Sequence, residues 1–360
     1  MHRWLFLCFS TVLLLCPRWS FPEAPSRQTT APEARQQLLQ ILAGEWVARA
    51  VYTAAKLQVA DQLQAGPCTL EQLSTALQVH PESLGRLLRA LEAFGVFQEV
   101  APRTFAQTAA SALLSSSHPQ SLRALTEFYG EEMHKAWDAL VPCIQTGTPA
   151  FQIAYSQPVF AFFKASPDHT ARFQAAMQQK SRWVAQAALQ AYPFCFGSIC
   201  DIGGGQGQFL QALLAKNPGT QGTLFELPEV IERARQQVAP LQSSCSLVAG
   251  DFFQGVPPGA DAYLLKSVIH DWEDDQAVCI LRNCLEAMKP ESKLLLIEVV
   301  LQPGPERLYA HCMDLLMLAI TGGRERSLQD FQRLFERSGL RLTQVYPTAT
   351  EFSILEAVKL

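Results

Sequence analysis

The sequence has no excess of basic residues. Its 360 residues include 29 lysines and arginines against 33 aspartates and glutamates, which gives a formal charge of −4. Nucleic-acid-binding proteins carry a basic face, so the composition gives no support for a nucleic-acid partner and none for an anionic membrane surface. With 48% hydrophobic residues the chain can bury a full core, and its length allows two domains.

Closely spaced cysteines are also absent, although the chain has ten cysteines. No C-x-x-C pair and no Cys/His cluster has the spacing of a zinc site. Several cysteines lie within apolar runs, where thiols are usually buried. The folded part is therefore predicted to be reduced and free of metal.

A long apolar run is missing as well. Residues 4–16 are apolar and follow a basic start, a pattern similar to a signal peptide but too short to span a bilayer comfortably. A proline, an arginine and a tryptophan at 17–19 occupy the place of a small-residue cleavage site. Residues 1–32 are expected to be a leader and linker. Whether the leader exports the chain, directs it to the endoplasmic reticulum or has no such role stays open.

Residues 33–115 are expected to form a winged-helix domain. Apolar residues recur at helical spacing over 37–50 and 51–64. A capping box at Thr69 starts the next helix, a further helix spans 81–94, and a strand follows it. Because the last helix has only two arginines, flanked by two glutamates, a dimerisation module fits better than a DNA reader.

Residues 116–195 are predicted to be a second helical region with many aromatic residues, most of them in the core. Met177 and Ser181 lie one turn apart on one helix face. Aromatics and a methionine just before a cofactor domain would also line an apolar acceptor pocket.

The stretch 198–209 organises the rest of the chain. An apolar run ends in Asp201, and glycines at 203–205 and 207 precede a helical segment. Glycines accept positive φ and let a ligand approach the backbone, and a helix start offers free N–H groups. A dinucleotide site needs G-x-G-x-x-G, but Gln208 stands where the third glycine belongs. The pattern D-x-G-x-G-x-G is typical instead of an S-adenosylmethionine (SAM) site.

From 196 onward, strands and helices alternate, which predicts an α/β domain over 196–360 with a mostly parallel sheet. Ligands of such sheets bind outside the carboxyl ends of the strands. Polar residues stand at these ends: Asp201, Glu226, Asp251, Lys266, His270 and Glu298. Their convergence on one edge predicts a functional site.

Individual roles follow from chemistry. Glu226, about twenty residues beyond the glycines, suits an acid that binds ribose hydroxyls. Asp251 would accept from the adenine amine while Phe252 covers the ring, and Lys266 would contact the edge of the cofactor. Each has a plainer alternative: a solvated strand end, a turn acid and an exposed lysine.

His270 is the candidate general base, because an imidazole titrates near neutrality. A carboxylate on one ring nitrogen would fix the tautomer and stabilise the imidazolium. Glu298, at the end of the next strand, and Glu325, in a Gly-rich loop, are the candidate partners. A structural histidine and two surface glutamates are the alternative.

Together these motifs resemble the class I, SAM-dependent small-molecule O-methyltransferases of the plant caffeic-acid and animal acetylserotonin type. The resemblance runs from about Gln37 to the C-terminus. It implies that His270 is the base, flanked by Glu298 and Glu325, and that Met177 and Met317 line the acceptor pocket. It implies SAM contacts at Asp201, Gly203, Gly205, Glu226, Asp251, Phe252, Lys266 and Ser181. It also implies a homodimer joined by the winged-helix domain, and a cytoplasmic location.

The sequence departs from the family in two places. Glu226 stands where the family usually has Asp, and the N-terminal apolar segment is foreign to its cytosolic members. The predicted function is SAM-dependent methyl transfer to a hydroxyl of a small aromatic molecule, without metal. The alternatives are a SAM-binding decarboxylase or hydroxylase-like relative, a SAM-sensing winged-helix regulator and an NAD-dependent enzyme.

Overall fold

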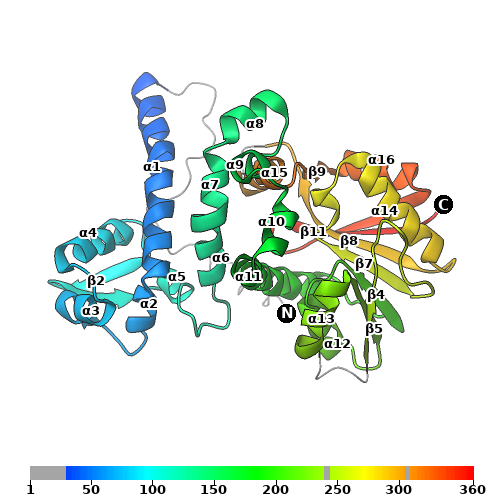
Figure 1. Ribbon diagram of the computed structural model, residues 1–360, viewed down its shortest axis with the longest axis horizontal. Coiled ribbons are helices and arrows are strands. Elements are labelled where there is room, and N and C mark those ends of the chain that lie inside the picture. Colours follow the sequence, from blue (N-terminus) through cyan, green and yellow to red (C-terminus); the bar gives the residue numbers. More distant parts are fainter. Residues whose placement is uncertain (1–29, 239–243, 305–307) are drawn as a thin grey trace, which may run out of the picture. The chain divides into compact units, whose positions relative to one another are not determined.

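The computed structural model of the chain describes residues 30–238, 244–304 and 308–360, so the predicted leader lies outside the described residues. These residues form two compact units that divide after Gly130 (Figure 1). Among them, no helix is long and apolar enough to cross a membrane.

The first unit is mostly helical. Its elements are α1 (Ala31–Lys56), α2 (Val59–Gln62), β1 (Cys68–Thr69), α3 (Leu70–Leu77), α4 (Pro81–Glu92), β2 (Phe97–Ala101), β3 (Thr104–Gln107), α5 (Ala109–Ala112) and α6 (Arg123–Phe128). The three strands pair antiparallel in the order β1-β3-β2. Helices α3 and α4 with the β2–β3 hairpin form the predicted winged-helix arrangement.

The capping box is confirmed and one helix boundary is wrong. Thr69 Oγ1 accepts from the N–H of Gln72 at 3.2 Å, and Gln72 Oε1 accepts from the N–H of Thr69 at 2.8 Å. The two helices predicted over 37–50 and 51–64 are largely one, because α1 has no Gly or Pro break between them. It ends before Gln58, which adopts a left-handed φ of 59°.

The second unit begins with helices. They are α7 (His134–Trp137), α8 (Leu140–Thr146), α9 (Ala150–Tyr155), α10 (Val159–Ala165) and α11 (Pro167–Ala191), after a π-helical turn, η1 (Tyr129–Met133). The alternating part follows: β4 (Ser198–Ile202), α12 (Gln208–Lys216), β5 (Gln221–Glu226), α13 (Pro228–Val238), β6 (Cys245–Ala249), β7 (Ala262–Lys266), η3 (Ile269–Asp271), α14 (Asp274–Ala287) and β8 (Lys293–Leu301). The chain ends with α15 (Leu308–Ile320), β9 (Arg326–Ser327), α16 (Leu328–Arg337), β10 (Leu340–Pro347) and β11 (Phe352–Lys359).

The large sheet has the order β10-β11-β8-β7-β4-β5-β6. The strands from β8 to β6 pair parallel, and β11 pairs antiparallel with both β8 and β10, so the predicted late antiparallel pair is confirmed. Because β4, β5, β7 and β8 are parallel, their carboxyl ends share one edge (Figure 1).

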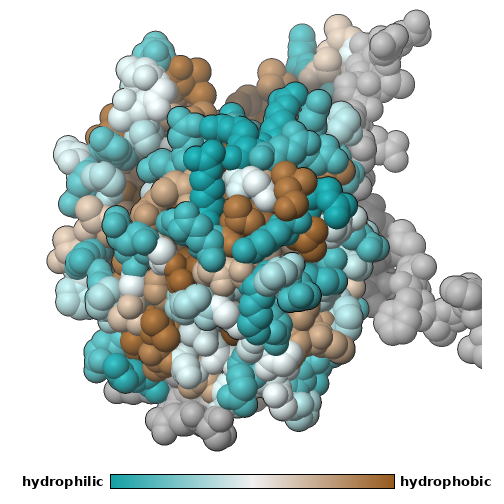
Figure 2. All heavy atoms as spheres, turned by 90° about the vertical axis from the view of Figure 1, so that its right-hand side faces the viewer, coloured by the Kyte–Doolittle hydropathy of each residue, from teal (hydrophilic) through white to brown (hydrophobic). Residues whose placement is uncertain are grey.

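Strand residues alternate between two cores. Ile199, Leu264 and Ile297 pack with α11 and α12 on one face, and Cys200 and Leu265 pack with α14 and α16 on the other. The predicted α/β fold with helices on both sides is confirmed. On the face drawn in Figure 2, hydrophilic side chains predominate and hydrophobic ones form separate patches.

Candidate active site

The glycine turn joins β4 to α12 at the carboxyl edge of the sheet. Gly203, Gly205 and Gly207 adopt φ values of 67°, 61° and 80°, in the left-handed region that favours glycine. A Cβ on Gly204 would lie 2.3 Å from Asp201 Oδ2. The turn therefore passes directly over the Asp201 carboxylate, and it has no room for larger residues.

Asp201 is fully buried, and in the described part of the chain neither of its carboxylate oxygens has a hydrogen-bond partner. Burial raises its pKa to about 7, against the opposing charge of Lys266. An unpartnered carboxylate under a glycine turn is costly unless a ligand compensates it. This arrangement fits a ligand that carries positive charge, as SAM does on its sulfonium and ammonium groups.

Glu226, at the end of β5, reaches the glycine turn. The N–H of Gly205 donates to Glu226 Oε1 at 3.1 Å, and the N–H of Leu227 donates to Oε2 at 2.8 Å. Burial raises the pKa of Glu226, although both N–H donors oppose the shift. The longer acid therefore lies against the turn, where the ribose of the cofactor is expected.

Helix α11 is fixed to the same edge by side-chain hydrogen bonds. Lys266 Nζ donates to Ser181 Oγ at 3.1 Å. Gln206, inside the glycine turn, donates to Gln174 at 2.8 Å and accepts from Gln178 at 2.7 Å. The structure therefore brings the predicted Lys266 and Ser181 together. The role of the three glutamines was missed, because their partners are distant in sequence.

Phe252 and Asp251 follow β6 and behave differently. A Cβ on Gly203 would lie 3.7 Å from Phe252 Cε1, so this ring lies beside the glycine turn. Asp251 Oδ1 accepts from the N–H of Phe253 at 2.9 Å. Asp251 therefore acts as a turn acid through that oxygen, and its contact with adenine stays a prediction.

His270 lies in η3, just beyond the end of β7, and meets both predicted glutamates. Its Nδ1 is 3.2 Å from Glu298 Oε2 and 3.2 Å from Glu325 Oε1. On the other side of the ring, Nε2 is 3.8 Å from Asp271 Oδ1. His270, Glu298 and Glu325 are all buried. Three residues from separate parts of the sequence thus form one cluster, with both glutamates on Nδ1.

Backbone contacts hold this cluster in place. The N–H groups of Val268 and Ile269 donate to Glu298 Oε1 at 3.0 and 2.8 Å. The N–H of Arg324 donates to the carbonyl oxygen of His270 at 2.9 Å. A Cβ on Gly323 would lie 2.0 Å from that same oxygen. The Gly-rich loop therefore lies flat on the backbone of His270, and only glycine fits there.

Arg326 is a supporting residue whose role is not evident from the sequence. Its guanidinium is 1% exposed and donates to the carbonyl oxygens of Ile269 at 2.9 Å and Trp272 at 2.7 Å. It also binds Asp274 Oδ1 at 2.9 and 3.1 Å. The segment that carries His270 is thereby held from both ends. The sequence showed only an arginine in a Gly-rich loop, which does not distinguish a buried from a solvated guanidinium.

The electrostatic field around His270 favours its charged form. Burial lowers the pKa of His270, but the carboxylates of Glu298, Glu325 and Asp271 outweigh it and raise the pKa to about 9. Burial in turn raises the pKa of Glu298 and Asp271, against the charge of His270. The cluster therefore holds a proton strongly. One ring nitrogen of His270 and one carboxylate oxygen each of Glu298 and Glu325 lie within 4.8 Å of one another, a spacing that would suit a metal ion.

The two predicted methionines lie on elements that frame this cluster. Met317 is 7% exposed and its carbonyl accepts from the N–H of Gly322 at 3.0 Å, so α15 ends where the loop of Glu325 begins. Met177 lies on the α11 face that carries Ser181. An open pocket adjoins Asp271, lined in part by Pro149, Phe160, Trp272 and Ile320. The contacts of both methionines with an acceptor stay predictions.

Two models of protein families match the chain. Residues 137–341 match the O-methyltransferase domain, and residues 39–117 match the O-methyltransferase dimerisation domain. Together they cover most of the region over which the sequence resembles this family.

Individual relatives agree with the family models. The chain is 38% identical to a phenazine O-methyltransferase of Lysobacter antibioticus, over 89% of this chain and 95% of the relative. It is also 38% identical to the mitomycin biosynthesis 6-O-methyltransferase of Streptomyces lavendulae, over 91% and 94%. A solved O-methyltransferase from neocarzinostatin biosynthesis, in complex with SAM and 2-hydroxy-5-methyl naphthoic acid, is 31% identical over 87% of this chain and 96% of that one, with a TM-score of 0.74.

Proposed function

This chain belongs to the O-methyltransferase family, and we propose that it transfers a methyl group from SAM to a hydroxyl of a small aromatic molecule. The observation that carries the proposal is the buried His270 with two carboxylates on Nδ1, at the same sheet edge as the glycine turn. The relatives include phenazine, mitomycin and 3-amino-4-hydroxybenzoate methyltransferases, which supports an aromatic acceptor.

SAM supplies an electrophilic methyl group when bound. On the protein side, Asp201, Glu226 and the backbone of the glycine turn would hold it, with Lys266, Ser181 and Phe252 around it. These groups fit, because Asp201 is buried without a partner and Glu226 contacts the turn.

His270 would take the proton of the acceptor hydroxyl at Nε2. Both carboxylates lie 3.2 Å from Nδ1 and favour a proton on that nitrogen, and with the proton there the free lone pair of the neutral ring lies on Nε2. A phenol has a pKa of about 10, so a base with a raised pKa is well matched to it. Both glutamates would then stabilise the imidazolium.

Calorimetry and an acceptor screen test this proposal. Residues 31–360 are titrated with SAM, S-adenosylhomocysteine (SAH) and NADH, and are then supplied with SAM and a panel of phenols and hydroxyindoles. Binding of both sulfur ligands but not NADH, followed by a product 14 Da heavier than its acceptor, is expected. Failure of a folded protein to bind SAM and SAH would overturn the proposal.

The mass of the product also distinguishes methyl transfer from the main alternative, a hydroxylase-like or decarboxylase activity. One relative, 33% identical, is named aclacinomycin 10-hydroxylase. A hydroxylase-like activity would add 16 Da instead, and a decarboxylase would remove 44 Da. Turnover that persists in a chelator would support the metal-free mechanism, whereas loss of activity that a divalent cation restores would assign the cluster at His270 to a metal.

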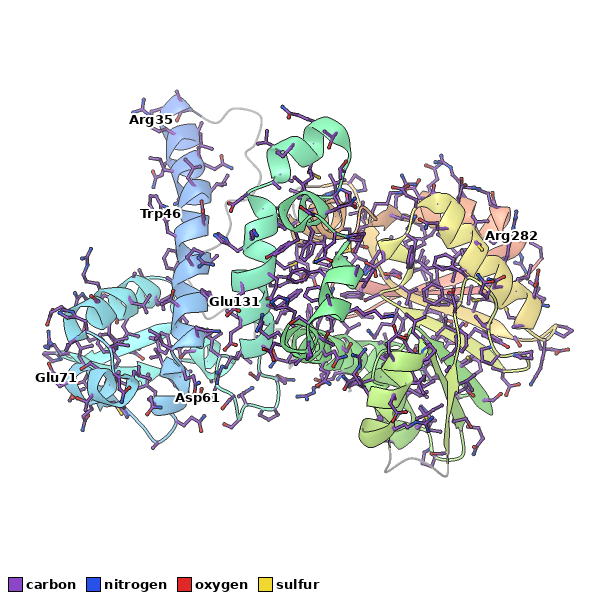
Figure 3. The ribbon with its side chains drawn as sticks, viewed as in Figure 1. Arg35, Trp46, Asp61, Glu71, Glu131 and Arg282 are labelled. Atoms are coloured by element: carbon purple, nitrogen blue, oxygen red, sulfur yellow. The ribbon has the colours of Figure 1, made fainter. Side chains whose placement is uncertain are left out.

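We further propose that the protein is a homodimer joined through its first unit, with the domain division 33–115, 116–195 and 196–360. The match to a dimerisation domain supports this proposal. So does α1, which exposes large apolar side chains: Leu38, Leu39, Ile41, Leu42 and Trp46 are 56–72% exposed. In Figure 3, Trp46 projects from the side of α1.

The poverty of basic groups in the wing argues against DNA binding. Arg103, in the β2–β3 turn, pairs with Glu71 at 2.7 Å and with Glu82 at 3.0 Å. A phosphate would have to compete with two carboxylates for this arginine. The location of the protein in the cell stays a prediction, because the leader lies outside the described residues.

A further inference from the structure

Lys180 is a cation near the base cluster that none of the roles above uses. It lies on α11, three residues after Met177 and one before Ser181, the residue that Lys266 attaches to the sheet edge. Its Nζ is 5.7 Å from the centre of the Phe352 ring. Phe352 begins β11 and pairs with Val299, the residue that follows Glu298. The ammonium group therefore lies near the end of β8, the strand that carries Glu298.

The charged groups that face Lys180 are Glu325, Asp271, Glu298 and the like-charged Lys266. Burial lowers the pKa of Lys180, and the three carboxylates oppose that shift. Yet within the described ranges no carboxylate oxygen lies within 4.0 Å of its Nζ. The ammonium thus feels negative charge without a direct ion pair.

The nearby carboxylates already have other partners. Glu298 accepts two backbone N–H groups on Oε1 and faces His270 Nδ1 with Oε2, and Glu325 faces the same nitrogen. Asp271 faces His270 Nε2. A partly buried ammonium is stabilised most by a carboxylate at hydrogen-bond distance. An anionic group on a ligand bound beside α11 would supply that partner.

We propose that Lys180 binds a carboxylate on the methyl acceptor, so that the enzyme selects aromatic hydroxy acids over their neutral analogues. The inference rests on the proposed methyl transfer and specifies its substrate class. It assigns Lys180 to the recognition of the acceptor, whereas the cofactor is held at the glycine turn.

Matched acceptors that differ only in charge test this inference. The pairs are 3,4-dihydroxybenzoate with 3,4-dihydroxybenzamide, and 3-hydroxy-2-naphthoate with its amide. Each is titrated by calorimetry into protein saturated with SAH, so the readout is binding and requires no turnover. Wild-type protein is expected to bind at least one acid about tenfold or more tightly than its amide, the usual contribution of a charged hydrogen bond.

Substitutions then locate the preference. Lys180→Met should bring the affinities for acid and amide together, and Lys180→Arg should retain most of the difference. Lys289→Met is the matched control, because Lys289 pairs with Asp261 at the opposite edge of the sheet at 2.7 Å. It should keep the full preference for the acid. All variants should bind SAH as the wild type does.

Each opposing outcome is distinct. Wild-type protein that binds SAH but does not prefer the acids, or binds no member of either pair, overturns the inference and leaves methyl transfer standing. A preference that survives in Lys180→Met means that another group binds the carboxylate. Loss of SAH affinity in Lys180→Met would reassign the lysine to the cofactor. No SAH binding by the wild type would refute the proposed function itself.

Discussion

At the scale of single residues, His270 is the test of the chemistry. Replacing it with Gln keeps a similar volume but removes the base, and we expect kcat to fall about 10²- to 10⁴-fold. SAH affinity should not change, because His270 lies beyond the glycine turn. Turnover assays measure the expected loss of kcat, and calorimetric titration measures the SAH affinity. Equal loss of both would mean that His270 supports the fold and not the reaction.

The raised pKa of His270 predicts a shifted pH profile. Only the neutral ring accepts a proton, so the rate should increase as pH rises through the pKa of about 9, well above the ordinary value of 6.5. Glu325 contributes to that shift, so Glu325→Gln should move the rising limb to lower pH. The measurement is kcat/KM for the acceptor against pH, at saturating SAM. If the rate of Glu325→Gln rises at the same pH as that of the wild type, Glu325 does not raise the pKa of His270.

At the scale of structural elements, the Gly-rich loop determines where His270 sits. Gly323→Ala would place a methyl group 2.0 Å from the carbonyl oxygen of His270. Loop and η3 must then separate, and displacements of this size at a base lower rates by up to about 10²-fold. Gly44→Ala, whose Cβ would meet nothing within 4 Å, is the control. Activity and thermal unfolding of both variants are compared, and full activity in Gly323→Ala would contradict the close packing.

The elements that sequence predicted well are those with local signals. The parallel strands stand out as short apolar runs that end in polar residues, and topology alone then brings their ends together. This is how Glu298 was placed near His270. The joined helix α1 shows the opposite case, because periodicity predicts helix but not where one helix ends.

The residues that sequence missed act through distant backbone groups. Arg326 binds carbonyl oxygens of Ile269 and Trp272, which carry no side-chain signature. Gln206 and Lys180 depend on the position of α11, which no pattern in the helical region specifies. The contact of Asp251 with adenine stays a prediction, although one of its oxygens accepts from the N–H of Phe253 in its own turn.

At the scale of the whole molecule, the exposed face of α1 predicts how two copies associate. Trp46 is 72% exposed, so Trp46→Glu should fold normally but should place a charge in the proposed interface. We expect a dimer of wild-type protein and a monomer of the variant by light scattering at micromolar concentration. Val100→Glu is the control, because Val100 is an exposed apolar residue of the same unit. A dimeric Trp46→Glu protein would place the interface elsewhere.

The hydrogen bonds between Gln206 and the pair Gln174 and Gln178 have a thermodynamic consequence. They join the turn that is proposed to contact the cofactor to the helix that carries Met177 and Lys180. A ligand that orders the turn is therefore expected to order this helix as well, and the coupling must be equal in both directions. The affinity for the acceptor should therefore rise when SAH is bound, and the affinity for SAH should rise by the same factor when the acceptor is bound.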